Sequence, residues 1–383
     1  MSRALPIWKP SPSRPLFHEQ SVEVLAELQA QGLRWVDPSG PGLSRIGGAG
    51  PSDHKAVQLG AHTVMVPIYT HAAGRSPFSA FVEPGGQSAV LMHSGHPVAV
   101  LRFPKTPRFY SRSTADGVPY WKIATLHAAD VLATTVLQTC IRYGQRERSC
   151  QFCAIGQSLA AGATIPRKTP EQLAEVAAAA VELDGVRHMV LTTGTPHTSD
   201  RGALVLSEAA RAIRARVELP IQAQCEPPDD PVWFERLREA GVDSLGMHLE
   251  AVTEDVRQRV MPGKAEVPLS AYFTAFEQAV AVFGRGQVST YVLAGLGDSE
   301  AAIVETCARL VRLGVYPFVV PFVPIRGTPL ERHPAAPPAF LTEVLARVAD
   351  VIARGGLSSE GIKAGCGRCG ACSTLKLREP AHA

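Results

Sequence analysis

Three cysteines lie close together on the segment 139–156, which has the sequence TCIRYGQRERSCQFCAIG. Cys140, Cys150 and Cys153 follow the spacing C-x9-C-x2-C, and Phe152 lies inside the close pair. Three thiolates can bind three irons of a four-iron cluster and leave the fourth iron open for a reacting molecule. The segment therefore predicts a chemically active [4Fe-4S] site with these three cysteines as its ligands.

A second trio of cysteines lies near the C-terminus in the sequence GCGRCGACS. Cys366, Cys369 and Cys372 have the spacing C-x2-C-x2-C, which suits thiolate capture of one metal centre, and the glycines let the chain wrap tightly. A redox disulfide or a zinc ion is an alternative, although three cysteines lack a fourth zinc ligand locally. We predict an auxiliary [4Fe-4S] cluster here.

Six β-like runs alternate with helix-like segments from about residue 129 onward. The runs are apolar and β-branched, as in strands buried on both faces, and serial βα units indicate a parallel sheet with right-handed crossovers. The predicted fold class is α/β, a partial (β/α)6 TIM-type barrel. Strands are expected at 131–139, 186–193, 220–226, 244–250, 287–294 and 315–323, and helices at 170–183, 204–217, 231–240, 269–283, 300–313 and 338–354.

Such a barrel presents its active site at the C-terminal ends of its strands. The first predicted strand leads directly into Cys140. The other five end in polar or glycine-rich clusters, which would all meet at the same rim: LTTGTP, QCEPP, MHLE, LAGLGDSE and VPIRGTPLE. This shared position predicts a functional site at that rim.

Three regions are expected along the chain. Residues 1–125 form an N-terminal accessory region that is partly β, with a helical piece at 21–32 and short runs punctuated by Gly and Pro, as in small antiparallel sheets. Within it, GPSDHK at 50–55 is predicted to be a surface turn. The barrel spans 126–335, and 336–383 holds a helix and the Cys-rich C-terminal tail.

Composition excludes several classes of protein. The chain is 45% apolar with a net charge of +3 over 383 residues, so it can bury a core and gives no reason to invoke nucleic acid. We find no signal peptide and no membrane-spanning run, which predicts a cytoplasmic protein with no membrane partner. Tightly clustered cysteines without a signal peptide favour metal binding over disulfides.

The cluster and rim motifs resemble those of the radical S-adenosylmethionine (SAM) superfamily, and most closely its biotin synthase-like branch, over about residues 130–335. CQFCAIG resembles the cluster motif, with Phe152 in the aromatic position beside adenine. TTGTP, which contains Thr193, Gly194 and Thr195, resembles the turn that contacts the methionine amino group. The chain also resembles an uncharacterised radical SAM group that occurs beside nitrilases in bacterial gene clusters.

Further rim residues fit the same resemblance. His248 and Glu250 match polar ribose-binding positions, Gly295 begins GLGDSE, which resembles the GLGE turn, and GTPL at 327–330 resembles the same tetrapeptide in biotin synthase. The resemblance implies a [4Fe-4S] cluster and SAM as cofactors, with reductive cleavage to a 5′-deoxyadenosyl radical. Auxiliary clusters in the related lipoyl and biotin synthases give up a sulfur atom. The tail trio could also ligate substrate or relay electrons, and a structural clasp is the alternative. A catalytic role requires the tail to fold back over the barrel mouth.

The chain departs from the common pattern in the first cysteine gap, which is nine residues instead of three. The alternative is a C-x2-C zinc knuckle with Cys140 as a bystander, although zinc alone does not account for the other five rim motifs. The gap carries Arg142, Arg146 and Arg148, whose charge could attract an acidic reducing partner such as flavodoxin or ferredoxin; a solvated loop is the alternative.

Several single residues allow two interpretations. Glu250 could accept hydrogen bonds from ribose or form a salt bridge with Arg257, and His248 could be a ligand or a satisfied rim histidine. Arg326 could hold a carboxylate or phosphate. Cys225 and Cys307 are expected to be buried core residues.

The leading hypothesis is a radical SAM enzyme that acts on a small-molecule substrate by sulfur insertion, rearrangement or oxidation. The alternatives are a non-enzymatic protein that binds or delivers an Fe–S cluster or zinc, and a zinc-dependent nucleic-acid or partner-binding module. Weak net charge and the lack of a basic, aromatic stripe argue against the last.

Overall fold

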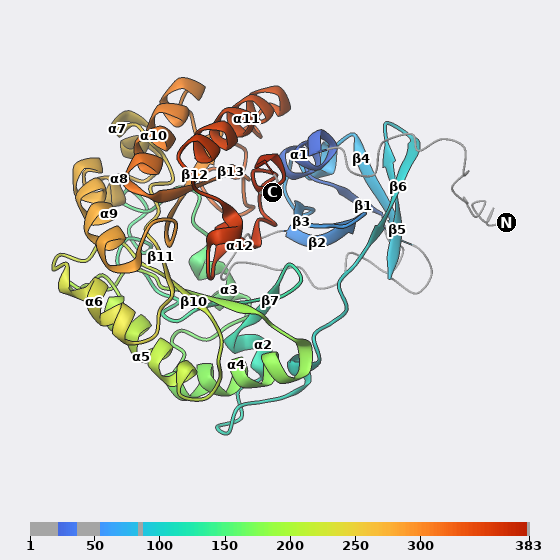
Figure 1. The fold of residues 1–383 in the computed structure, drawn as a ribbon. Coiled ribbons are helices and arrows are strands. Elements are labelled where there is room, and N and C mark those ends of the chain that lie inside the picture. Colours follow the sequence, from blue (N-terminus) through green and yellow to red (C-terminus); the bar gives the residue numbers. More distant parts are fainter. Residues whose placement is uncertain (1–21, 37–53, 83–86, 381–383) are drawn as a thin grey trace.

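A seven-stranded sheet forms the centre of the computed structural model, which describes residues 22–36, 54–82 and 87–380. Its order is β13-β12-β11-β10-β9-β8-β7, and all neighbours are parallel except β7 and β8. The sheet curls into a half-barrel with β7 and β13 at its edges (Figure 1). The strands are β7 Thr125–His127, β8 Val131–Thr135, β9 His188–Thr192, β10 Ile221–Gln224, β11 Ser244–Gly246, β12 Val288–Ala294 and β13 Val315–Pro321.

Helices follow the parallel strands and cover the outer face of the sheet (Figure 1). The first of these helices, α4, shows how the local sequence fixes where a helix begins and ends. The Thr169 hydroxyl accepts from the Gln172 amide at 3.2 Å, the Gln172 side chain accepts from the Thr169 amide at 3.0 Å, and Gly185 ends the helix with φ 65°. The helices are α4 Pro170–Asp184, α5 Ala203–Arg214, α6 Val232–Glu239, α7 Glu254–Val260, α8 Pro262–Ala265, α9 Leu269–Phe283, α10 Glu300–Leu313 and α11 Pro338–Arg354.

The six strands and six helices predicted from the sequence are all present, and most of the strands end a few residues early. They end early because the chain turns into the rim loops, where its backbone groups bond to neighbouring loops instead of strands. The half-barrel is therefore confirmed, whereas its description as a (β/α)6 barrel and the three region boundaries stay predictions.

A second sheet has six strands in the order β1-β4-β5-β6-β2-β3, and only the β1–β4 pair is parallel. The predicted partly β character of this region is confirmed. The expected turn at 50–55 is wrong for His54 and Lys55, which begin β2, and its first four residues lie outside the described chain. The strands are β1 Arg34–Val36, β2 His54–Leu59, β3 His62–Pro67, β4 Phe78–Val82, β5 Ser88–His93 and β6 His96–Arg102.

Helix α1, Val22–Gln31, joins the two sheets by packing against both β3 and α11. Leu25 and Leu28 are fully buried, as expected for the inward face of an amphipathic helix. The second sheet lies on the side of the half-barrel away from α5, α6 and α9, next to the C-terminal tail (Figure 1). Residues from both ends of the chain thus meet beside the central sheet.

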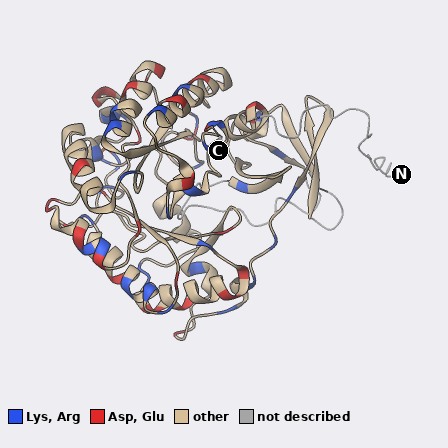
Figure 2. Ribbon diagram, in the orientation of Figure 1, with Lys and Arg blue, Asp and Glu red and all other residues tan. Residues whose placement is uncertain are grey.

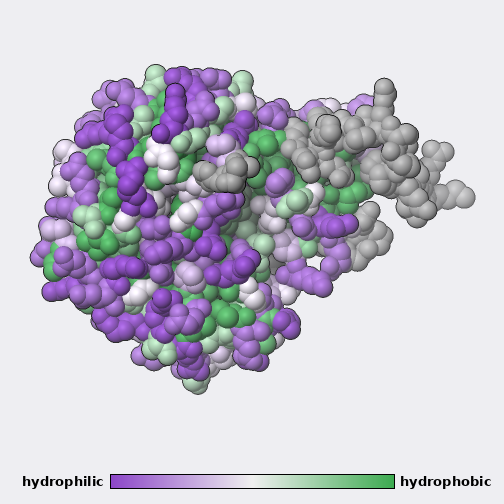
Figure 3. Space-filling view, in the orientation of Figure 1, coloured by the Kyte–Doolittle hydropathy of each residue, from purple (hydrophilic) through white to green (hydrophobic). Residues whose placement is uncertain are grey.

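Charge lies mainly on the outer helices, where basic and acidic residues alternate (Figure 2). The visible face is largely hydrophilic with scattered hydrophobic patches (Figure 3). Among the described residues, no helix combines the length and the apolar character needed to cross a bilayer.

Candidate functional site

The loop after β8 places Cys140 directly against the TTGTP turn. The Ile141 amide donates to the Thr195 carbonyl at 3.0 Å, and the Gly194 amide donates to the Leu137 carbonyl at 2.8 Å. A Cβ on Gly194 would lie 2.1 Å from the Thr139 carbonyl oxygen, so only glycine allows this approach. The first cysteine and the predicted methionine-binding turn are therefore neighbours.

Cys150 and Cys153 form a tight turn, in which the Cys153 amide donates to the Cys150 carbonyl at 3.0 Å. Between them, the Gln151 amide donates to the Val260 carbonyl at 2.8 Å, which ties the turn to the end of α7. Burial raises the pKa of the Cys153 thiol to about 12 and that of Cys150 well above its usual value, with negative neighbours including Glu250 and Cys140 adding to the latter. Such thiols need the charge of a metal centre to ionise.

Arg142 is buried, so it is not part of the solvated basic loop that the sequence suggested. Its guanidinium pairs with Glu226 and donates from Nε to the Gly263 carbonyl at 2.7 Å. The Thr195 hydroxyl donates to the same Glu226 oxygen, Oε1, at 3.0 Å. Glu226 Oε2 is buried and has no hydrogen-bond partner among the described residues, which leaves one acceptor available beside the Thr195 turn. The expected attraction of a redox partner can rest only on Arg146 and Arg148, which are exposed.

Glu250 forms a salt bridge with Lys264, with Nζ and Oε2 2.9 Å apart, and not with Arg257 as the alternative interpretation supposed. The Arg257 guanidinium is fully buried, where it donates to the Leu249 carbonyl and lies 3.8 Å from Glu254. Burial tends to lower the pKa of Lys264, but negative neighbours led by Glu250 raise it above its usual value. Lys264 is thus kept charged beside Glu250 and close to Cys150.

His248 is partly buried beside Glu250, and among the described residues only one of its two ring nitrogens has a hydrogen-bond partner. Its Nδ1 accepts from the Tyr291 amide at 3.2 Å, which assigns the proton of the neutral ring to Nε2. Nε2 is buried and has no partner within the described residues. Burial, followed by the positive charge of Lys264, lowers the pKa of His248 to about 3, so the ring stays neutral. An unpartnered N–H donor therefore remains at this site.

Two further predicted positions lie outside the cavity described below. Gly295, with φ 116°, packs against Ala336, and its carbonyl contacts His333 Nε2 at 2.9 Å. Arg326 is exposed, and its carbonyl accepts from Gln157 at 2.9 Å. Their cofactor-binding roles stay predictions. Cys225 and Cys307 are buried, as expected.

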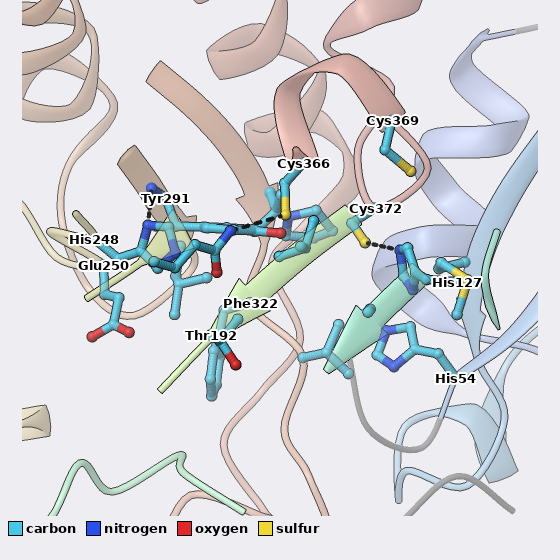
Figure 4. A pocket seen from close by; sticks show the side chains of 18 of the residues that line it. His54, His127, Thr192, His248, Glu250, Tyr291, Phe322, Cys366, Cys369 and Cys372 are labelled. Atoms are coloured by element: carbon cyan, nitrogen blue, oxygen red, sulfur yellow. Dashed lines mark hydrogen bonds between the residues drawn. The ribbon is translucent and has the colours of Figure 1, made fainter. Parts of the chain in front are cut away.

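A cavity of about 340 Å³ lies inside the curl of the sheet. Phe152, His248 and Glu250 line it toward the C-terminal ends of the strands, and Figure 4 shows the last two of these side chains. Its other end is lined by all three tail cysteines, by His127 from β7 and by His54 from β2 of the second sheet. The three tail cysteines and Phe152, which lies between Cys150 and Cys153, therefore face one space, whose size is in the range of small-molecule sites.

The tail reaches this cavity from the end opposite the mouth, which corrects the expectation that it folds over the mouth. The Gly365 amide donates to Nδ1 of His188 at 3.2 Å, and His188 begins β9. The Cys366 amide donates to Gln222 Oε1 at 3.2 Å, and the Gln224 side-chain amide donates to Cys366 Sγ at 3.3 Å. The sulfur atoms thus enter from the N-terminal ends of the strands.

The other end of the tail trio is held by residues from the N-terminal region. The Ala371 carbonyl accepts from the Met65 amide at 2.8 Å and from the Gln29 side chain at 2.9 Å. Cys372 Sγ lies 3.4 Å from His127 Nε2 (Figure 4). Within the part of the chain that the structure describes, no group of three or more His, Cys, Asp or Glu side chains is placed to hold a single metal ion. A cluster has different requirements, because its ligands bind different irons.

Sequence reasoning missed several of these polar residues. Glu226 enters the sequence analysis only as part of the QCEPP cluster at a strand end. The other missed residues are Lys264, His127, Gln222 and Gln224. Gln222 and Gln224 could have been found from the sequence, because they lie in a strand expected to be buried on both faces. Buried side-chain amides need hydrogen-bond partners, which indicates a polar contact at this strand.

Comparisons with known proteins agree with this geometry. Residues 147–310 match the sequence model of the Radical SAM superfamily. A bacteriochlorophyllide c C-7(1)-hydroxylase of Chlorobaculum limnaeum is 30% identical over 226 residues, which are 53% of this chain and 55% of that protein. The chain thus spans about half the length of this curated relative.

Solved structures with similar folds include methylornithine synthase, at 17% identity and a TM-score of 0.46 over 65% of this chain and 69% of the other. A radical SAM methyltransferase from Sphaerobacter thermophilus has 16% identity and a TM-score of 0.45 over 81% of this chain and 82% of the other. The sequence match is the firmer of the two kinds of finding, and it covers Cys150, Cys153 and the Gly194 and Glu250 positions. Residues 147–310 of this chain are therefore similar in sequence to the radical SAM superfamily.

Proposed function

We propose that the protein is a radical SAM enzyme that cleaves SAM reductively at a [4Fe-4S] cluster held by Cys140, Cys150 and Cys153. The observation that carries this proposal is the contact between the Cys140 loop and the Gly194 turn, with Glu250 close to Cys150. A cluster with three protein ligands needs its fourth iron next to the groups that bind the amino acid end of SAM, and this contact provides that proximity.

The residues around the trio fit SAM in charge and in hydrogen-bonding capacity. Glu226 Oε2 is a buried acceptor beside Thr195 and suits the ammonium group. His248 Nε2–H is a buried donor and suits a ribose oxygen, while Glu250 can accept from a ribose hydroxyl. Phe152 lines the same cavity and offers an aromatic face to adenine.

When bound, the cluster and SAM would supply one-electron cleavage of the sulfonium C–S bond, giving methionine and a 5′-deoxyadenosyl radical. The chain positions the partners and limits access of water, because Phe152, Phe322 and Leu293 line the cavity next to the polar groups. Exposed Arg146 and Arg148 beside the trio offer a docking point for an acidic reducing protein such as flavodoxin or ferredoxin.

The substrate is proposed to be a small molecule that sits between the two cysteine regions. A cavity of about 340 Å³ that both regions line supports this position. Of sulfur insertion, rearrangement and oxidation, the last is favoured because the relative in Chlorobaculum limnaeum is named a hydroxylase. Membership of the biotin synthase-like branch, or of the group beside nitrilases, is part of the proposal and rests on the sequence resemblance alone.

The tail trio is proposed to hold an auxiliary [4Fe-4S] cluster. Burial raises the pKa of the Cys369 thiol to about 12 and also raises that of Cys366, so these buried thiols are stable as ligands only with a positively charged centre. Because all three line the substrate cavity, the cluster would face the substrate from the side opposite SAM.

The decisive experiment is anaerobic reconstitution with iron and sulfide, followed by dithionite and SAM. We expect 5′-deoxyadenosine from the wild type and none above background from Cys150→Ala. Cys225→Ala is the control, because Cys225 is a buried cysteine that directly follows β10 and has no role in the proposed site. Wild-type protein that binds iron but forms no 5′-deoxyadenosine, with no change of its spectrum on SAM addition, would support a non-enzymatic Fe–S protein instead.

A further inference from the structure

Residues 138–155, which we call the cysteine loop, are closed at their base by one side chain. Gln138 lies two positions before Cys140, and Ile155 lies two positions after Cys153. The Gln138 side-chain amide donates from Nε2 to the Ile155 carbonyl at 3.0 Å. The segment with all three cysteines of the first trio is therefore a closed loop, and the side chain of Gln138 joins its two ends.

Lys168 fixes the orientation of this side chain. Its ammonium donates to Gln138 Oε1 at 3.4 Å, to the Thr135 carbonyl at 2.7 Å and to the Ile165 carbonyl at 3.4 Å. Because an ammonium can only donate, it requires the oxygen of the Gln138 amide on its own side. The NH2 group of that amide is thereby directed at Ile155.

These contacts lie in the interior of the protein. Gln138, Ser158 and Lys168 are all buried, and Gln138 Nε2 also donates to Ser158 Oγ at 3.1 Å. Burial lowers the pKa of Lys168 to about 7, and no carboxylate of the described residues offsets this effect. A lysine buried without an acidic partner costs stability, so a reason other than stability is needed for its presence at the base of the loop.

The two ends of the cysteine loop also meet at the turn that is proposed to bind SAM. A Cβ on Gly194 would lie 2.1 Å from the Thr139 carbonyl oxygen and 3.0 Å from Ile155 Cδ1. The Ile155 amide, in turn, donates to the sulfur of Cys153. The position of Ile155 therefore affects both the Gly194 turn and the hydrogen bonding of a proposed cluster ligand.

We propose that Gln138 is a positioning residue, oriented by Lys168, that holds the two ends of the cysteine loop at the separation that one cluster requires. This inference rests on the proposed function and goes beyond it by naming what accommodates the nine-residue gap between the first two cysteines. Residues 144–148 of that gap are exposed, whereas the base of the loop is held from within the core. The added residues can thus extend into solvent without separating the ligands.

The test compares Gln138→Met with the wild type in the full chain. Methionine fills a similar volume and forms no such hydrogen bonds, so amides 154–158 of the apoprotein should exchange hydrogen faster. After anaerobic reconstitution, formation of 5′-deoxyadenosine should slow by about 10–100-fold, as is typical when a residue that orients a metal ligand is lost. The midpoint potential of the paramagnetic signal that responds to SAM should become more negative, because the Ile155 amide is no longer held on the Cys153 sulfur.

Gln138→Glu separates the two contacts of this side chain and keeps the core intact. Its carboxylate still accepts from Lys168 but cannot donate to the Ile155 carbonyl. We expect this variant to fold and to share the slower reaction and the more negative potential. Lys168→Met should change both in the same direction but by less, because the Gln138 amide can still reach Ile155 without a fixed orientation.

Gln172→Met is the matched control, because Gln172 is another buried glutamine, and its side chain bonds to Thr169 and Asp116 instead of the cysteine loop. It should lower the urea midpoint and leave the potential and the exchange of amides 154–158 unchanged.

Two results would overturn the inference: wild-type potential and exchange in both Gln138 variants, or equal shifts in Gln172→Met. Wild-type protein that forms no 5′-deoxyadenosine would instead count against the proposed function. Hydrogen exchange in the apoprotein would then still decide whether Gln138 closes the loop.

Discussion

The two cysteine regions share one cavity but are built differently. The trio of Cys140, Cys150 and Cys153 lies on an irregular loop whose residues 144–148 are exposed and whose buried anchor is the ion pair between Arg142 and Glu226. The tail trio is short, glycine-rich and fixed on both flanks by hydrogen bonds from β9, β10, β3 and α1.

This difference matches the work proposed for each region. A site that must admit SAM and an electron donor needs one accessible side, and unpartnered atoms such as His248 Nε2 remain there for a ligand to satisfy. In the tail, the Gly365 and Cys366 amides and the Ala371 carbonyl are bonded to the chain itself, so this segment is held in place without a bound molecule. The tail end of the cavity is thus rigid, whereas the end near the first trio is open to a ligand.

The largest expected effect comes from removing one trio at a time. Replacing Cys366, Cys369 and Cys372 with Ala should remove about half of the iron and sulfide and abolish substrate turnover, while formation of 5′-deoxyadenosine persists. Iron and sulfide analysis beside chromatography of the nucleoside checks this. Loss of all iron from the tail variant would mean that the two regions are not independent sites, and the contrast drawn between them would be wrong.

A second test addresses the charge pair at the mouth. Glu250→Gln leaves the buried Lys264 without its partner, and we expect the free energy of unfolding to fall by about 3–5 kcal/mol. Adding Lys264→Met to that variant should recover most of the loss, because no uncompensated charge is then buried. Urea denaturation followed by circular dichroism measures both. An unchanged midpoint in Glu250→Gln would show that this pair does not stabilise the mouth.

A third test uses pH to loosen the tail. Burial, aided by nearby Arg368, Lys376 and Arg187, lowers the pKa of His188 to about 4 in spite of Asp130. The unfolded chain, with a pKa near 6.5, binds the proton first, so stability is full above about pH 6.5 and declines by up to about 3 kcal/mol as the pH falls toward 4.

The matched variant is His188→Asn, which keeps an acceptor for the Gly365 amide but cannot titrate. Its unfolding free energy should decline less between pH 6.5 and pH 4 than that of the wild type. Equal declines in the two proteins would assign the acid sensitivity to other groups, among which His248 has a pKa lowered in the same direction.

The smallest effect is expected on the outer side of the cysteine loop. Arg148 pairs with Glu266, and both side chains are about half exposed. Arg148→Ala should therefore change the unfolding free energy by less than about 1 kcal/mol. It should instead slow reduction by an acidic electron donor at low salt, and the difference should vanish as salt is raised. A rate that is insensitive to both changes would place the donor elsewhere.

The sequence was sufficient to predict the six strand–helix repeats, because apolar runs and helix caps such as Thr169 are local signals. It also predicted that Gly194 and Glu250 lie near the first trio, since parallel strands bring their ends to one rim. The predicted ends of the strands were less accurate, because hydrogen bonds to neighbouring loops decide where the hydrogen-bond ladder between two strands ends.

The electrostatic partners could not be predicted from the sequence. Arg142 looked like one of three loop arginines, and only the fold brings Glu226, 84 positions away, to its guanidinium. The side from which the tail enters the cavity could not be predicted either, because it depends on contacts with His188 and with the second sheet. Ion pairs and tail docking are long-range contacts with no periodic signature along the chain.

The hydrogen bonds at the Ala371 carbonyl have a consequence for biogenesis. Gln29 lies 342 positions before Ala371, so these hydrogen bonds join segments that are synthesised far apart in time. The cradle around Cys372 can close only after Ala371 has left the ribosome, whereas the loop with Cys150 is synthesised earlier. The rear compartment of the cavity can therefore form only after the segment that holds the first trio has been made.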